Sequence, residues 1–179
     1  MRKLRNVLLI LIVIVLTAAC AGCDYISYKD YYTIENYAEI WDLSGLALQR
    51  VDSHFLFPQK IEDYDVANFL CRYDQQLPLG EGVQILLEVQ FEDEEALTAE
   101  QNRIAAIATV CTEHFQASLL EVYAISLGEN LFYEYALVDK DQNKIYFIYL
   151  QDIPKKEIEF PHSLLPDSYS RYLEIPLSL

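Results

Sequence analysis

Basic residues are scarce in this sequence. Its 179 residues include 13 Lys and Arg against 28 Asp and Glu, which gives a formal net charge of −15. Proteins that bind nucleic acids cluster Lys and Arg against the phosphates, so the acidic balance argues against a nucleic-acid partner. It argues equally against a peripheral protein that basic side chains hold on anionic lipid.

Glycine and proline are also few, with five and six residues, while 53% of the residues are hydrophobic. Disordered chains have the opposite composition, because they lack the apolar surface that would offset the entropy of folding. A chain of this length is long enough to bury a core as one domain. We therefore expect a single folded domain after any N-terminal targeting segment.

Familiar catalytic and cofactor motifs are missing. There is no Gly-rich phosphate loop, no Gly-x-Ser-x-Gly elbow and no His-Glu-x-x-His. The three histidines, His54, His114 and His162, are far apart and have no ligand spacing. We accordingly predict no catalytic residue, no metal and no cofactor.

Two acidic stretches have plain structural interpretations. Glu92–Glu95 precedes an amphipathic stretch, where acids favour the helix macrodipole, and a calcium site is the alternative. Asp139–Asn143 mimics the opening of an EF-hand loop, but Lys144 stands where that loop needs Gly and Leu150 where it needs Glu. Asp and Asn also suit tight turns, so we interpret 139–143 as a turn.

The N-terminus has the parts of a secretory signal. Basic residues at positions 2, 3 and 5 precede an aliphatic run, Val7–Leu16, and small residues, Thr17–Ala19, precede Cys20. The run is shorter than the ~20 apolar residues of a spanning helix. Extension of the run through Ala21 leaves an uncleaved membrane helix as the alternative.

The stretch Leu16-Thr17-Ala18-Ala19-Cys20 resembles the lipobox of bacterial lipoproteins. In that family the cysteine receives a diacylglycerol on sulfur, the signal is cut before it, and the cysteine begins the mature chain. The resemblance implies a signal peptide over 1–19, an acylated (palmitate-type) Cys20, and a membrane anchor on the extracytoplasmic face. Cys23 is the rival anchor, but Cys20 would then occupy a position where the motif usually has an aliphatic residue.

We expect the segment 20–32 to be the lipidated cysteine and a polar, Tyr-rich tether, with 33–179 as the domain. Ile34, Tyr37, Ala38 and Trp41 have the spacing of one apolar helix face. We interpret Trp41 as a core residue in preference to a platform for stacking a ligand.

Alternating apolar residues predict strands, most clearly over 83–91, where Val83, Ile85, Leu87 and Val89 share one face. The other face is predicted to be polar apart from Leu86, with Gln84, Glu88 and Gln90 on it. Similar patterns predict strands over 118–127, 131–139 and 144–151, and over 66–74, where Ala67, Phe69, Cys71 and Tyr73 share one face. A stripe of Leu97, Ile104, Ile107, Ala108 and Cys111 predicts a helix over about 94–110. Both faces of the last two strands are apolar or aromatic, which indicates cover on both sides.

The fold class that follows is α+β: a single antiparallel sheet of about five strands with two helices packed mainly on one face, in the order helix-strand-strand-helix-strand-strand-strand. The proline-containing tail from Asp152 should wrap the surface irregularly. The strands Glu134–Val138 and Ile145–Leu150, with the strand that leads into the acidic helix start, resemble those of small uncharacterised lipoproteins of Gram-positive bacteria.

Two further cysteines lie in the domain. Cys71 should face inward from its strand, and Cys111 should end the helix stripe, so the two could approach each other. A disulfide is possible outside the cytoplasm. Two buried thiols, packed as small apolar side chains, are the alternative.

Function is less specified than location. The leading hypothesis is a non-enzymatic envelope lipoprotein, a binding or interaction module that holds an unknown protein or small molecule at the membrane. The alternatives are a hydrolase of an envelope polymer that uses two carboxylates, which 28 acids could supply by chance, and an accessory subunit of a membrane complex.

Overall fold

The computed structural model describes residues 26–31, 33–42, 56–62, 64–76, 80–111, 115, 120–128, 132–153 and 155–169. The predicted signal peptide, both candidate anchors (Cys20 and Cys23) and two histidines (His54 and His114) lie outside the described residues.

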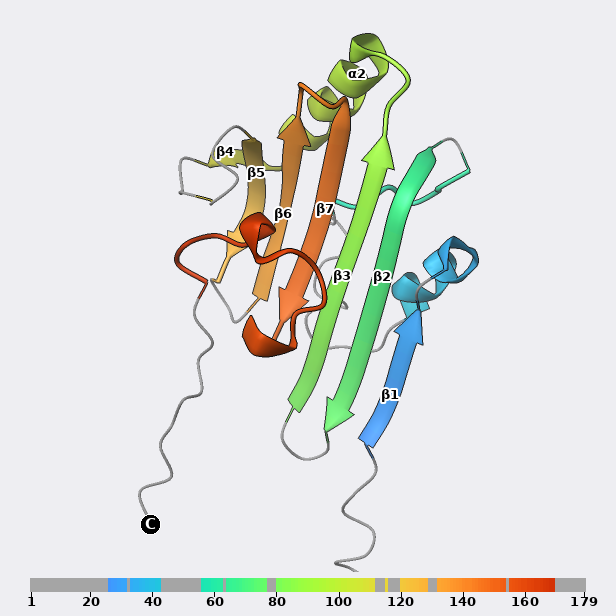
Figure 1. Cartoon of the computed structure of the whole chain (residues 1–179), viewed down its shortest axis with the longest axis vertical. Coiled ribbons are helices and arrows are strands. Elements are labelled where there is room, and N and C mark those ends of the chain that lie inside the picture. The colour runs from blue at the N-terminus through green and yellow to red at the C-terminus, as the bar shows by residue number, and fades with distance from the viewer. Residues whose placement is uncertain are drawn as a thin grey trace, which may run out of the picture.

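The described chain forms one antiparallel sheet with the strand order β1-β2-β3-β7-β6-β5-β4 (Figure 1). The strands are β1 (Ile26–Tyr31), β2 (Asp65–Gln76), β3 (Gly80–Gln90), β4 (Thr109–Cys111), β5 (Glu121–Leu127), β6 (Phe132–Asp139) and β7 (Lys144–Gln151). The helices are the α-helix α2 (Glu94–Ala105) and three 3-10 helices, η1 (Ile34–Asp42), η4 (Lys155–Glu157) and η5 (His162–Leu164).

The single antiparallel sheet is confirmed, but its proportions differ from the prediction. Among the described residues, six strands of at least six residues and the three-residue β4 replace the expected five. In the same described part, one α-helix stands where two were expected, because the first helix is of the 3-10 type. The described part is therefore mostly sheet and only partly α+β.

The first predicted helix, η1, has a different apolar face from the one that α-helical spacing indicated. A 3-10 helix has three residues per turn, so Ile34, Tyr37 and Ile40 align. Tyr37 and Ile40 are buried and Ile34 packs against them, whereas Ala38 is exposed. The expectation for Ala38 was wrong for this reason. The prediction for Trp41 is not tested, because its side chain lies outside the described part.

Part of the expected tether is an edge strand. Ile26–Tyr31 pairs with β2 in a register that runs from Ile26 opposite Gln76 to Tyr31 opposite Cys71. Ile and Tyr favour strands, and the twelve-residue β2 offers an unpaired edge that another strand can cover. The sheet therefore begins before residue 33, where we expected the domain to start.

The predicted helix over 94–110 ends early, at Ala105. Asp93 caps its start, with the side chain accepting a hydrogen bond from Ala96 N at 2.8 Å. The β-branched pair Thr109 and Val110 instead joins the sheet in β4, as β-branched residues favour. Ile107, expected in the buried stripe, is 37% exposed.

The sheet separates two apolar cores, because alternate residues of a strand point to opposite faces. On β3, Val83, Ile85 and Leu87 belong to the first core, while Leu86 belongs to the second. The first core further contains Tyr37, Ile40, Leu56, Phe57, Phe69, Cys71, Tyr73, Val89, Phe91, Leu97, Ile104, Tyr123, Ala136, Val138, Ile145, Phe147 and Tyr149. The second further contains Leu70, Phe115, Val122, Tyr133, Tyr135, Leu137, Ile148, Leu150, Ile153, Ile158, Phe160, Leu164, Leu165 and Tyr169.

A bulge changes the predicted face of β2. The pairing with β3 is irregular between Val66 and Asn68, so the alternation shifts there. Phe69 and Cys71 are buried as expected, but Ala67 is exposed and Val66 packs against the first core in its place.

Each core is covered by a segment outside the sheet. Residues from η1, from 56–58 and from α2 complete the first core. Residues 153–169 complete the second and cross over the strands on the other face (Figure 1). The expected wrapping by the tail is confirmed over its described part.

Gln84 fastens this C-terminal segment to the sheet. It lies on the face of β3 that the pattern predicted to be polar, yet its exposed fraction is 0%. Its Nε2 donates a hydrogen bond to Glu157 O and its Oε1 accepts one from Glu159 N, both at 3.0 Å. One buried amide thus satisfies two backbone groups of the covering segment.

This attachment predicts that Gln84→Ala lowers the free energy of unfolding by about 2 kcal/mol, because it removes two part-buried hydrogen bonds to the covering segment and the packing of a buried side chain. Urea denaturation measures the change. Gln142→Ala, in the exposed turn between β6 and β7, is the matched control and should change stability by less than about 0.5 kcal/mol. Equal effects of the two substitutions would contradict the attachment.

Candidate functional site

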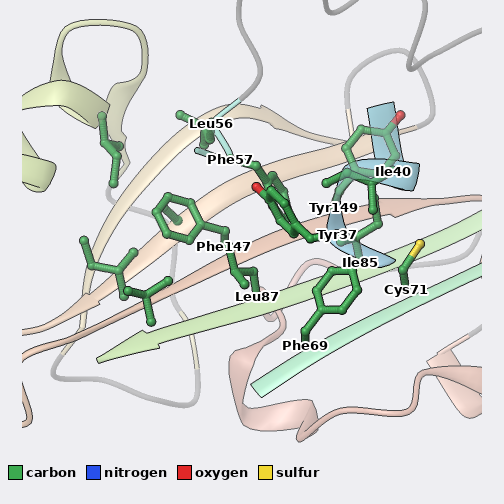
Figure 2. Close-up of a cluster of buried hydrophobic side chains, with 14 of the residues drawn as sticks. Tyr37, Ile40, Leu56, Phe57, Phe69, Cys71, Ile85, Leu87, Phe147 and Tyr149 are labelled. Atoms are coloured by element: carbon green, nitrogen blue, oxygen red, sulfur yellow. The ribbon is translucent and has the colours of Figure 1, made fainter. Parts of the chain in front are cut away.

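The polar chemistry inside the molecule gathers around one short segment, Leu56–Pro58. All three of its residues are buried, and Leu56 and Phe57 belong to the first core. Leu56 and Phe57 lie in the cluster that Figure 2 shows, with the ring centroids of Phe57 and Phe147 5.7 Å apart. The backbone of such a buried segment needs hydrogen-bond partners, and three side chains supply them.

The first partner is Glu134 of β6. Its strand neighbours on the same face, Ala136 and Val138, are apolar and buried, so the carboxyl enters the first core. Glu134 is 0% exposed. Its Oε1 accepts a hydrogen bond from Leu56 N at 2.5 Å. Its Oε2 is buried and has no hydrogen-bond partner among the described residues.

Burial raises the pKa of Glu134 to about 8, and the hydrogen bond from Leu56 N offsets part of that rise. The carboxyl is therefore mostly protonated at neutral pH. Neighbouring Tyr149, directly opposite Glu134 on β7, has its pKa raised chiefly by burial and secondly by Glu134. A neutral carboxylic acid suits this apolar site, where an isolated carboxylate would be costly.

The second partner is Arg103 of α2. Its Nη2 donates hydrogen bonds to Leu56 O and to Glu100 Oε1, each at 2.6 Å. Its Nε donates to both Glu100 oxygens, at 2.9 and 3.0 Å, so the pair is bidentate. Tyr64 OH donates to Glu100 Oε2 at 3.1 Å. Burial, and then the charge of Glu100 and the bond to it, raise the pKa of Tyr64 to about 12.

The third partner is Tyr37 of η1, whose hydroxyl donates a hydrogen bond to Pro58 O. Burial is the main cause that raises the pKa of Tyr37. Its ring meets Phe69 edge to face, with the centroids 5.6 Å apart. A tyrosine that packs by its ring and bonds by its hydroxyl suits the boundary between a core and a buried backbone.

These contacts make a clamp, by which we mean Glu134, Arg103 and Tyr37 acting on the backbone of Leu56–Pro58. The three side chains come from β6, α2 and η1, which are far apart in sequence. The clamp binds a segment of its own chain, and Glu134 is covered by Leu56. The clamp holds a proton on Glu134 and fixes the backbone of Leu56–Pro58.

The acidic stretches singled out from the sequence have structural roles. A shallow depression beside the first turns of α2 is lined by Asp93, Glu94, Glu95, Thr98, Ala99 and Asn102. Asp139 Oδ1 accepts hydrogen bonds from Asp141 N and Gln142 N at 3.1 and 3.0 Å, which confirms the turn. Within the described ranges, no group of three or more His, Cys, Asp and Glu is placed to hold a metal ion.

The candidate disulfide is not formed. Cys71 belongs to the first core and Cys111 packs against the second, so the sheet separates them. No disulfide joins the two thiols, and four strands lie between β2 and β4. The proximity that we expected assumed that Cys111 ended a helix, whereas it ends β4. Of the histidines, His162 is described and lies exposed in η5.

None of the clamp residues was predicted from the sequence to be a functional residue. Glu134 carried a usable signal, because it is the acidic residue within an otherwise apolar strand face. Arg103 and Tyr37 carried none, since an arginine near a helix end and a tyrosine on a helix face are ordinary. Their role depends on where the loop at Leu56 returns to the sheet, which no local pattern specifies.

The chain matches no protein-family model, no curated protein and no solved structure. Of the helices in the described part, none has both the length and the apolar character needed to cross a membrane.

The raised pKa of Glu134 predicts a pH-dependent stability. Between about 4.5, where the unfolded chain releases this proton, and about 8, the native chain binds more protons than the unfolded one. The contribution of Glu134 to stability therefore falls as pH rises through this window. Glu134→Gln cannot ionise, so it should gain stability relative to the natural protein by on the order of 1 kcal/mol per pH unit. Urea titrations from pH 5 to 8 measure the difference.

Glu121→Gln is the matched comparison. Hydrogen bonds from Lys140 and Tyr123 lower the pKa of Glu121, so its contribution is present above its unfolded pKa and is lost as pH falls. The offset between this variant and the natural protein should change only in acid. A constant offset for Glu134→Gln across pH 5 to 8 would contradict a proton held by Glu134.

The ion pair of the clamp is tested by a double-mutant cycle. Arg103→Met leaves the Glu100 carboxylate, whose side chain is 7% exposed, without its cationic partner. This variant should lower the free energy of unfolding by about 2 kcal/mol. The loss is smaller than for a fully buried pair because the Arg103 side chain is 37% exposed. Adding Glu100→Gln removes this uncompensated charge. The loss of unfolding free energy in the double variant should therefore be smaller than the sum of the losses in the two single variants. Additive losses in thermal or urea unfolding would show that the two residues act independently.

Proposed function

We propose that this protein is a membrane-anchored extracytoplasmic lipoprotein. The observation that carries the proposal is the Leu16–Cys20 lipobox, placed after a basic lead and the aliphatic run Val7–Leu16. Each of these parts has a role in export: the basic lead stays inside, the apolar run inserts, and the small residues admit a peptidase. Together they favour export followed by cleavage before a lipidated cysteine.

Acylation at Cys20 would hold the domain at the outer face of the membrane. Each buried methylene contributes about 0.8 kcal/mol, and a single acyl chain binds only marginally. Two chains on one cysteine make release slow. All 28 acids follow residue 23, so they belong to the part of the chain that would remain after the signal is removed. This acidic domain would be held at the membrane by its lipid and not by attraction to the lipid headgroups.

We further propose that the anchored domain is a non-enzymatic binding or interaction module, with a protein or small molecule as its partner. Glu134, whose pKa is raised, is fully buried, so this carboxyl does not suit the role of a hydrolase's catalytic acid, which must reach its substrate. Among the described residues, the large hydrophobic side chains that are exposed are Ile107 and Val110, at 37% and 55%. Both lie at or next to β4, the terminal strand of the sheet, and exposed apolar residues suit contact with a partner.

The lipobox predicts that Cys20→Ala abolishes labelling by a radioactive or clickable fatty acid and leaves the precursor uncut. Labelling and gel mobility in the producing bacterium measure both effects. Cys23→Ala is the matched control and should be acylated and processed as the natural protein is. Normal maturation of Cys20→Ala, or failure of Cys23→Ala alone, would overturn the assignment of the anchor to Cys20.

A further inference from the structure

We propose that the sheet stands on the lipid bilayer by one end, which carries the start of β1, and that α2 points away from the membrane. We call these the membrane end and the distal end. The inference rests on the proposed function, because it takes the anchor near the N-terminus as given. It adds which part of the folded domain meets the lipid surface.

The register of the sheet defines the membrane end. Ile26, the first residue of β1, lies opposite Gln76 at the end of β2, and Gln76 lies opposite Gly80 at the start of β3. Gln151, the last residue of β7, lies near this end, opposite Val83. Figure 1 shows these strand ends together, with α2 at the opposite end of the sheet.

The distance between the anchor and β1 is short. Five residues, 21–25, separate Cys20 from Ile26, and they span at most about 18 Å when fully extended. If Cys23 is the anchor, two residues remain and the limit is tighter. The eleven residues of β3 span about 36 Å. The tether therefore reaches the membrane end easily and is much shorter than the sheet.

The acids of the distal end favour the same orientation. The distal end carries many exposed acids, which are Glu62, Asp65, Glu92, Asp93, Glu94, Glu95 and Asp141. Two lysines there, Lys140 and Lys144, are paired with Glu121 and Glu88 at 2.8 and 2.7 Å. An anionic bilayer repels such a surface within roughly 10 Å at physiological salt. The distal end is thus poorly suited to contact with anionic lipid.

Energy transfer between the domain and labelled lipid tests the orientation. The full lipidated protein carries p-azidophenylalanine in place of Lys155, which is exposed just after β7, or in place of Asp141, which is exposed in the distal turn. Each variant is reconstituted into phosphatidylglycerol–phosphatidylethanolamine vesicles that contain a headgroup-linked acceptor, and a donor dye is then attached from outside. Transfer from position 155 should exceed transfer from position 141 several-fold.

Flotation of the same vesicles separates the two proposals. Protein that fails to float with lipid overturns both the anchor and the orientation. Protein that floats but transfers equally from both positions, or more from 141, overturns the orientation alone. Twenty Gly and Ser residues inserted after Tyr25 add about 25 Å of flexible reach and should bring the two transfers closer together. An unchanged ratio would overturn the short tether as its cause.

Discussion

The burial of both faces of the central strands is the constraint on which the rest of this structure depends. On β6, every residue from Tyr133 to Val138 is buried, and β3 and β7 also contribute to both cores. An antiparallel sheet commonly leaves one face to water. This sheet does not, so segments outside its strands must cover it: η1, 56–58 and α2 on one face, and residues from 153–169 on the other.

Covering segments bring their backbone into apolar surroundings, where each N–H and C=O needs a partner. The sheet meets this need with polar side chains that point into the cores. Gln84 satisfies the C-terminal segment, and Glu134 satisfies Leu56 from the other face. The same burial that makes Glu134 useful raises its pKa. A packing requirement of the fold has therefore produced a titratable group whose protonation is linked to stability.

The features that could be predicted from the sequence are those that a local pattern of residues determines. The strand over 144–151 has the predicted bounds, the turn at 139–143 forms, and the face of β3 that carries Val83 and Leu87 is buried. The predictions from sequence failed where tertiary context decides the structure. The strand β1 forms because β2 offers an open edge, and the 3-10 geometry of η1 gives it a different buried face. Cys111 was expected at the end of a helix but ends the strand β4. The clamp was missed because its partners converge only after the chain returns at Leu56. The anchor is a local motif, which is why the sequence alone proposes it.

Amide hydrogen exchange tests the two-sided burial most directly. The account predicts that the slowest amides lie in β3, β6 and β7, which open only in global unfolding, and that Leu56 N–H, bonded to Glu134, is protected although it lies outside any strand. Amides of β1 and β4, the terminal strands, should exchange sooner. Rapid exchange in β6, or a Leu56 amide that exchanges as fast as an exposed one, would contradict it.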